Sequence, residues 1–418
     1  MILAARKVLP VTSPPINHGA VYIEHGKVVA VGGEKEIIRK FPGSRLLDLG
    51  MCVLMPGLVN LHTHLDLSHL QGRISLDGGF FEWIESLVEL KHKGGTKGLL
   101  AAADKALTGA IETGTTCIGD ISSADAAIPS IESSGIRAVV FEEVLGLDNA
   151  KADTIFESLN TRLSHFKGLP ERIRPGISPH ATYSVSSSLL NRISEHTSSN
   201  TIAKTIHISE TIDEMRYFTG KPSGFDGYMK KFGWDNIEQN RGRTPLQFLK
   251  EHMKLNYILA VHAVHVTKKD MTLLRKYGAT VAHCPRSNVL LGVGRAPVNE
   301  MLECGINVGF GTDSLASNED LDLWEEMRAS FKYYRMEASK VIEMATINGA
   351  RGLRLGEVTG SIEPGKYADL IAVETPASAK KDPSRELIME AGYDNVIMTM
   401  VEGKPLHLSE ELKGSYGL

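Results

Sequence analysis

The sequence predicts an α/β protein, a (β/α)₈ or TIM barrel with a small β-sandwich that is built from both chain ends. Three observations support this fold class. Between residues 57 and 356, short apolar runs alternate with longer helical patterns, and eight such units can be counted. Strand-rich segments precede and follow this region. Residues able to do chemistry end at least five of the apolar runs, as expected at the carboxyl-terminal face of a barrel.

The two chain ends contain the strand-rich segments. Residues 20–24 and 27–31 flank His25-Gly26, which has the form of a two-residue hairpin turn, and residues 46–54 form another extended apolar stretch. After Gly356 the strand pattern returns at residues 360–373 and 396–401. We therefore expect residues 1–56 and 357–418 to form one composite β-sandwich domain around a barrel domain of residues 57–356.

The central region supplies the barrel. Its expected strands are residues 58–62, 115–120, 138–142, 174–178, 204–208, 258–264, 280–283 and 307–311. Helical patterns between and after them include residues 98–112, 187–196, 267–277 and 321–332. A doubly wound open sheet has the same alternation, and we favour the barrel because chemical residues end so many of the strands.

Composition limits the partners. The 418 residues carry a formal net charge of −4 without a long basic run, which argues against a nucleic-acid partner. The sequence contains no run of about 20 apolar residues, so we expect no membrane span. The amino terminus lacks the pattern of a secretory signal. Four widely separated cysteines suit a reducing compartment. We expect a cytoplasmic protein with a small-molecule partner.

Histidines mark the ends of several expected strands. His62 and His64 point to the same side of a strand, because strand side chains alternate with a period of two. His207 and His262 end two later apolar runs, and Asp313 follows a third. One such histidine is more often a core residue than a ligand, whereas the whole set indicates a metal site.

The ligand types indicate the metal. Imidazole nitrogens with one carboxylate suit one divalent zinc or iron ion, while calcium and magnesium prefer oxygen. Three histidines and an aspartate leave a position for water, whose pKa such an ion lowers toward roughly 7. A hydrolytic reaction at neutral pH follows.

Three residues are candidates for catalysis. Glu210, three residues after His207, can shuttle a proton to the leaving group, although a solvated glutamate at a helix start is the alternative. Asp313 can accept a proton from the attacking water. His262 can polarise the substrate, and we take His265, its competitor, as lying farther from the reaction.

These residues resemble the amidohydrolase superfamily over nearly the whole chain. The resemblance rests on the motifs at residues 56–64, 207–210, 261–265, 283–288 and 311–314, and on the segment 360–373. Within the superfamily, the chain is similar to the branch that contains S-adenosylhomocysteine, methylthioadenosine and guanine deaminases and the triazine hydrolases.

That resemblance implies roles for particular residues. It implies that one metal ion is held by four side chains: His62, His64, His207 and Asp313. Glu210 and His262 would be the catalytic pair, assisted by Asp313. His180, which follows the fourth expected strand, would contact the substrate. Proteins of this kind are commonly dimers, so we expect a homodimer.

A narrower resemblance is to aminodeoxyfutalosine deaminases of the alternative menaquinone pathway. It rests on residues 64–70, 79–84, 119–122, 284–288 and 314–318. The chain departs from that pattern at two positions, where Asp66 replaces a glutamate and Thr182 replaces a proline. We expect Asp66 to contact a substrate hydroxyl.

Two further side chains are candidates for substrate binding. Trp83 could stack against a purine or close the pocket, with core packing as the alternative. Arg286 could bind a substrate carboxylate through two hydrogen bonds, although a surface or capping role is more common for such an arginine.

The sequence thus predicts a metal-dependent aminohydrolase that deaminates an adenine-containing, nucleoside-like substrate. Aminodeoxyfutalosine is the favoured substrate. Methylthioadenosine, S-adenosylhomocysteine, adenosine or guanine deamination and triazine-type chlorohydrolysis are the alternatives, and a non-catalytic barrel scaffold is a minor one.

Overall fold

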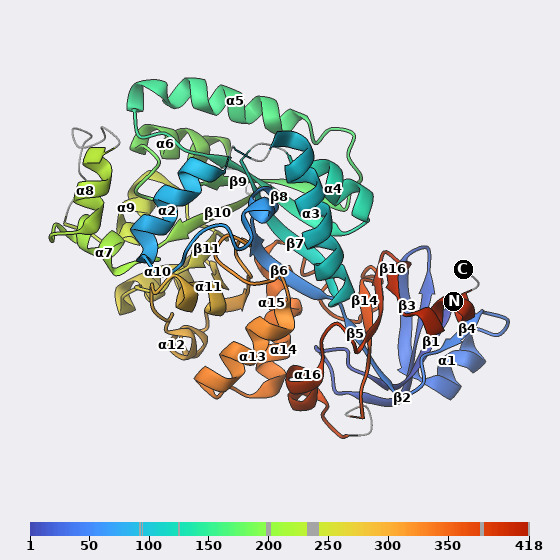
Figure 1. Ribbon diagram of the computed structural model, residues 1–418. Helices are drawn as coiled ribbons and strands as arrows, with labels where there is room; N and C mark the ends of the chain where they lie inside the picture. The colour runs from blue at the N-terminus through green and yellow to red at the C-terminus, as the bar shows by residue number, and fades with distance from the viewer. Residues whose placement is uncertain are drawn as a thin grey trace.

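The computed structural model describes residues 1–91, 93, 95–123, 126–197, 202–231, 242–376 and 380–416. A barrel surrounded by helices makes up most of the molecule, and a smaller sheet beside it carries both chain termini (Figure 1). The predicted fold class is therefore confirmed.

Parallel strands form the barrel in sequence order. They are β6 (Leu58–Thr63), β7 (Thr115–Ser122), β8 (Arg137–Val144), β9 (Ile173–Pro179), β10 (Ala203–Ile208), β11 (Leu259–His262), β12 (Thr280–His283) and β13 (Asn307–Phe310). Residues just beyond β13 return to β6: Thr63 pairs with Asp313 in a parallel bridge, and the backbone N–H of Asp313 donates to the His62 carbonyl. This contact brings the first and last strands together.

Every residue of β6, β7 and β10 is buried. Strands of parallel sheets are covered on both faces, so they are apolar almost throughout rather than alternating with polar residues. This explains why the barrel strands were visible in the sequence as short apolar runs.

Helices cover the outside of the barrel (Figure 1). They are α2 (Gly79–Leu90), α3 (Gly95–Glu112), α4 (Ile128–Ser134), α5 (Ala152–Ser164), α6 (Ser187–His196), α7 (Ile212–Thr219), α8 (Gly224–Lys231), α9 (Pro245–His252), α10 (Lys268–Lys276), α11 (Pro285–Leu290), α12 (Val298–Glu303), α13 (Leu323–Tyr334), α14 (Ala338–Ala345) and α15 (Ile347–Gly352), with the 3₁₀ helices η1 (Leu65–Leu70) and η2 (Asn149–Lys151).

Hydroxyl side chains begin several of these helices. Ser186, Thr211, Thr244 and Thr267 each accept a hydrogen bond from a backbone N–H in the first turn of the helix that follows. Such caps satisfy donors that have no partner within the helix, and they fix where each helix starts. The α7 cap at Thr211 thereby fixes the chain just after Glu210.

The second sheet joins the two ends of the chain. Its path is β16-β15-β14-β5-β1-β2-β3, with β4 pairing β1. The strands are β1 (Ile2–Val8), β2 (Ile16–Glu24), β3 (Lys27–Gly33), β4 (Leu46–Asp48), β5 (Cys52–Pro56), β14 (Leu370–Glu374), β15 (Val396–Val401) and β16 (Lys404–Leu408). Helices α1 (Glu34–Lys40), α16 (Ser384–Glu390) and α17 (Glu410–Tyr416) belong to the same chain ends.

The predicted hairpin turn lies between β2 and β3. His25 and Gly26 have φ angles of 49° and 76°, as a two-residue turn with two positive φ angles requires. The predicted pairing of the chain ends is seen directly, because β5 is antiparallel to β14. The division into domains at residues 56 and 357 stays a prediction.

A buried ion pair joins the sheet to the barrel. Arg137, the first residue of β8, donates from Nε to Asp369 at 2.6 Å and from a terminal nitrogen to Glu402 at 3.1 Å. The guanidinium also lies over the ring of Tyr367.

Among the helices of the described ranges, none has the length and apolar character needed to cross a bilayer.

Candidate metal centre and active site

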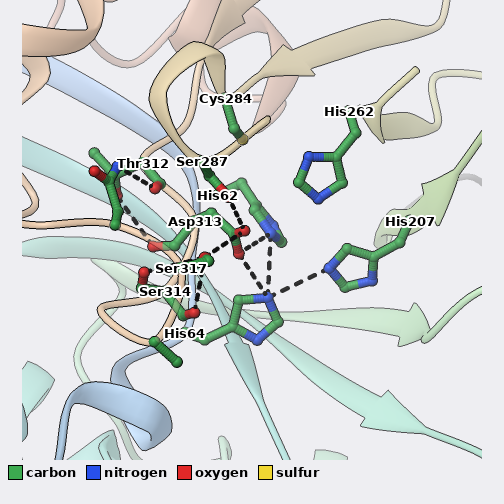
Figure 2. Close-up of polar contacts among 12 residues, drawn as sticks. His62, His64, His207, His262, Cys284, Ser287, Thr312, Asp313, Ser314 and Ser317 are labelled. Atoms are coloured by element: carbon green, nitrogen blue, oxygen red, sulfur yellow. Dashed lines mark hydrogen bonds and ion pairs between the residues drawn. The ribbon is translucent and has the colours of Figure 1, made fainter. Parts of the chain in front are cut away.

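Four predicted ligands converge at the carboxyl-terminal ends of the barrel strands. His62 and His64 lie at the end of β6, His207 on β10, and Asp313 just after β13. The Nε2 atom of His64 is 3.1 Å from that of His62 and 3.3 Å from that of His207. One Asp313 carboxylate oxygen, Oδ1, is 3.4 Å and 3.5 Å from the Nε2 atoms of His62 and His64 (Figure 2).

These separations fit a metal ion. Two ligand atoms that each bind zinc at about 2.0–2.1 Å with tetrahedral angles lie roughly 3.3 Å apart. Three imidazole nitrogens and one carboxylate oxygen face one another at that spacing. His62, His64, His207 and Asp313 could therefore hold one divalent ion.

Neighbouring groups orient two of these ligands. The Nδ1 atom of His207 donates to the carbonyl oxygen of His180 at 2.7 Å, which directs Nε2 toward the cluster. Ser287 and Ser317 donate to Oδ2 of Asp313 at 2.6 Å and 2.8 Å, which leaves Oδ1 facing the histidines (Figure 2). These three hydrogen bonds are typical of contacts that orient metal ligands.

Burial sets the protonation of the cluster. It lowers the pKa of His64 and of His207 well below the ordinary value, and the proximity of His62 adds to the effect. Neutral imidazoles with free lone pairs result. Burial would raise the pKa of Asp313, but the hydrogen bond with His62 and the nearby histidines hold it well below its usual range, so its carboxylate is charged.

Glu210 and His262 form a pair beside the cluster. The carboxylate Oε1 of Glu210 is 3.7 Å from Nε2 of His262, and both side chains are buried. The Nδ1 atom of His262 donates to Oδ1 of Asn288 at 2.9 Å, which leaves Nε2 directed at Glu210. Burial raises the pKa of the Glu210 carboxyl.

The backbone is strained where these side chains leave the strands. Ser209, His262, Ala263 and Asp313 all have positive φ angles between 48° and 67°. Residues other than glycine rarely adopt this conformation, and it persists where the surrounding structure enforces it. The strain turns the chain sharply after β10, β11 and β13, at the level of the site.

Two predicted substrate-binding residues are near the ligand cluster: His180 lies beside His207 in space, and Asp66 follows His64 by two residues in the sequence. The His180 ring centroid is 5.0 Å from that of His207, and its Nδ1 atom is 2.7 Å from the Ser184 hydroxyl. Asp66 lies on η1, where it accepts hydrogen bonds from the backbone N–H groups of Ser123 and Ala127. Contact of either residue with substrate stays a prediction.

The other two predicted substrate-binding residues already have protein partners. The indole nitrogen of Trp83 donates to the carbonyl oxygen of Ala316 at 2.8 Å, and the side chain packs within the core. Arg286 donates to both carboxylate oxygens of Asp320 and to Glu319. Their predicted contacts with substrate remain untested.

Glu143, near the end of β8, is a further candidate site residue that was not predicted from the sequence. One of its carboxylate oxygens and the ring nitrogens of His180 and His207 all lie within 4.8 Å of one another. In the described ranges, no atom forms a hydrogen bond with Oε1 of Glu143, and burial raises the pKa of this carboxyl to about 7. Two consecutive acidic residues at the end of an apolar run, Glu142 and Glu143, were the available signal.

Comparisons with known proteins agree with this geometry. A 5-methylthioadenosine/S-adenosylhomocysteine deaminase from Syntrophobacter fumaroxidans is 32% identical over 376 residues, which is 85% of this chain and 80% of that protein. A zinc-bound adenosine deaminase from Xanthomonas campestris has 25% identity and a TM-score of 0.85, covering 98% of this chain and 93% of that one.

The fold is also that of aminofutalosine deaminase from Helicobacter pylori, solved with methylthio-coformycin. That structure has a TM-score of 0.87 at 22% identity and covers 97% of this chain and 99% of its own. The family model described as "Amidohydrolase family" matches residues 53–406. The chain therefore belongs to the amidohydrolase family and is a hydrolase that acts on carbon–nitrogen bonds.

Proposed function

We propose that this protein is a metal-dependent hydrolytic deaminase of an adenine-containing, nucleoside-like substrate. One observation carries the proposal: the ligand set of three histidines and Asp313 lies next to the buried Glu210–His262 pair. Metal-dependent hydrolysis uses a metal site, a group that moves protons and a group that polarises the substrate, and this arrangement offers residues for all three.

A divalent ion bound by these ligands would act as a Lewis acid that makes water a stronger nucleophile. The remaining steps fall to side chains of this chain. Water adds to the ring carbon that bears the amino group, the carbon–nitrogen bond breaks, and ammonia leaves. Asp313 can accept the first proton from water, and Glu210 can deliver a proton to the departing nitrogen.

His262 polarises the substrate in this proposal. Its Nδ1 proton is committed to Asn288, so Nε2 is the ring nitrogen available to the site. Glu210 lies 3.7 Å from His262, so a charge that forms on one of the two side chains during proton transfer can be stabilised by the other. Burial raises the pKa of Glu210, which favours the protonated form that delivers a proton to the departing nitrogen.

The substrate proposal rests on two supports. The relative from Syntrophobacter, 32% identical, is named for deamination of 5-methylthioadenosine and S-adenosylhomocysteine, so adenine is the base we propose. Aminodeoxyfutalosine stays our first choice within that class, because of the motifs at residues 64–70 and 79–84. 5-Methylthioadenosine is the second choice. Zinc or iron as the metal, a homodimer and a cytoplasmic location stay predictions.

A substrate panel tests the proposal. Purified protein would be incubated with aminodeoxyfutalosine, methylthioadenosine, S-adenosylhomocysteine, adenosine and guanine. Ammonia release and the ultraviolet shift of the purine would be followed together. We expect at least one adenine compound to react. Reaction of a chlorinated triazine or a non-purine alone would contradict the proposal, and a protein that takes up no transition metal would favour the scaffold alternative.

A further inference from the structure

A separate cavity of about 310 Å³ lies between α11 and α13, next to the carboxyl-terminal end of β12. His283 and Asn288 are the buried polar groups in its lining, and Val289 and Tyr333 line it with half-exposed side chains. Among the described residues that line it, none is a candidate metal ligand, and neither Glu210 nor His262 is present. A volume near 300 Å³ is within the range of small-molecule sites.

His283 brings unsatisfied hydrogen-bonding atoms to this cavity. His283 is 1% exposed, and neither ring nitrogen has a hydrogen-bond partner among the residues that the structure describes. Burial, with the proximity of His262, lowers its pKa to about 3, so the ring is neutral. A neutral imidazole offers one N–H donor and one acceptor nitrogen. Buried polar atoms in folded proteins nearly always form hydrogen bonds, so we expect this ring to have a hydrogen-bond partner in the cavity.

Asn288 adds a second unsatisfied donor. Its Oδ1 atom accepts the hydrogen bond from Nδ1 of His262, at 2.9 Å, whereas its Nδ2 atom has no hydrogen-bond partner within the described part of the chain. The side chain is 1% exposed. The cavity therefore presents two donors and one acceptor, and one of the donors belongs to the amide that positions His262.

Aromatic rings form part of the lining. The Tyr334 ring meets His283 edge to face, with centroids 5.5 Å apart, and Tyr333 packs against Tyr334 at 4.8 Å. The guanidinium carbon of Arg295 lies 4.0 Å from the centroid of the Tyr333 ring. Flat aromatic faces favour a planar ligand, which buries a large area and loses little conformational freedom.

We infer that this cavity is a second small-molecule site, for a planar nitrogen heterocycle that carries a hydrogen-bond donor and an acceptor on neighbouring atoms. The lactam edge of hypoxanthine has this pattern, and so does the amidine edge of adenine. A ring N–H or amino group donates to the acceptor nitrogen of His283, and the neighbouring carbonyl or ring nitrogen accepts from Nδ2 of Asn288. The inference does not depend on the proposed deaminase activity.

Calorimetric titration with hypoxanthine tests this inference on the metal-loaded protein. The Val289→Trp variant places an indole at the mouth of the cavity, and Val29→Trp, on β3 with 39% of its side chain exposed, is the matched control. We expect Val289→Trp to bind one hypoxanthine fewer per chain than the wild type and Val29→Trp do. If the deaminase proposal fails and the metal centre binds no purine, Val289→Trp should bind no hypoxanthine, and the wild type and Val29→Trp should each bind one per chain. The difference of one hypoxanthine per chain therefore persists.

A second variant guards against an indole that turns away from the mouth. His283→Phe keeps a planar ring and removes both nitrogens, and we expect its affinity at this site to fall at least tenfold. A crystal soaked in hypoxanthine should show the heterocycle against His283 and Asn288. Wild-type stoichiometry and affinity in both variants, or ordered water alone in the soaked cavity, would overturn the inference.

Discussion

At the scale of single residues, the site combines groups whose protonation is set by burial with groups held by directed hydrogen bonds. Neutral His64 and His207 can offer lone pairs, and Asp313 keeps a charged oxygen toward them. Glu210 has a raised pKa and no place in the ligand cluster. This division predicts that metal binding and proton transfer can be separated by mutation.

Glu210→Gln and His62→Ala test that separation. Glutamine keeps the size of Glu210 but cannot carry the proton, so we expect turnover to fall by at least about 10²-fold with metal content unchanged. His62→Ala removes a ligand and should lose both metal and activity. Elemental analysis and ammonia release on the same preparations measure the two effects. Full turnover in Glu210→Gln would contradict the assignment.

The hydroxyl groups behind Asp313 should affect metal affinity. Ser317→Ala removes the 2.8 Å hydrogen bond to Oδ2 of Asp313, so the carboxylate becomes less well oriented. Loss of such a contact typically weakens metal binding about 10–100-fold, measurable by competition with a chelator. Ser330 is also buried, but its hydroxyl has no hydrogen-bond partner among the described residues, so Ser330→Ala is the control and should keep wild-type affinity. Equal affinities in the two variants would be the contrary result.

At the scale of helices and strands, the elements place chemical groups by ending at defined positions. The sequence predicted each barrel strand to within a few residues, because buried parallel strands are apolar runs bounded by helical patterns. It also predicted the convergence of His62, His64, His207 and Asp313, since strand ends meet at one face of a barrel.

Other features were beyond prediction because they depend on tertiary contacts. The local sequence pattern does not show that Arg286 forms ion pairs with Asp320 and Glu319. It also does not show that the indole N–H of Trp83 donates to a backbone carbonyl. The approach of Glu143 to His180 depends on how neighbouring strands are staggered. Periodicity gives the face on which a residue lies, but it does not give its partner across the barrel.

The amino terminus of α13 provides a prediction at this scale. Asp322 caps the helix by accepting from the Trp324 N–H, and burial raises its pKa to about 6. A carboxyl whose pKa is higher in the folded than in the unfolded state makes the protein less stable as pH rises from about 4 to about 6, and the deficit is complete above that range.

Asp322→Asn should remove this penalty, because asparagine keeps the capping oxygen without the charge. We expect the variant to be more stable than the wild type by about 3 kcal/mol at pH 7, with the difference vanishing below about pH 4. Urea unfolding at both pH values measures it. Asp322→Ala, which loses the cap, should be destabilised at pH 4, and a pH-independent effect of Asp322→Asn would contradict the explanation.

At the scale of the whole molecule, the barrel and the sheet of the chain ends share a buried charged contact. Arg137 of β8 is 1% exposed and pairs with Asp369, also 1% exposed, just before β14. Without Asp369, the buried Arg137 charge would keep only the partly exposed Glu402 carboxylate as an acidic partner. The contact therefore couples the two ends of the chain to the stability of the barrel.

Asp369→Ala should lower the free energy of unfolding by about 3–5 kcal/mol, measured by chemical denaturation. The exposed pair of Lys93 and Glu89 gives the control, and Glu89→Ala should change stability by less than about 1 kcal/mol. The double variant Arg137→Met/Asp369→Leu, which removes both charges, should recover much of the loss. Equal effects of Asp369→Ala and Glu89→Ala would show that the buried pair does not join the two parts.

We propose that one divalent ion, held by His62, His64, His207 and Asp313, makes this chain a deaminase of an adenine-type nucleoside. Stripping the metal and adding zinc or iron(II) back in substoichiometric steps, with ammonia release from the reactive adenine compound followed at each step, tests it most directly. We expect activity to rise linearly with added metal and to stop rising at one ion per chain. Ammonia release by the metal-free protein, or activity that needs two ions per chain, would contradict it.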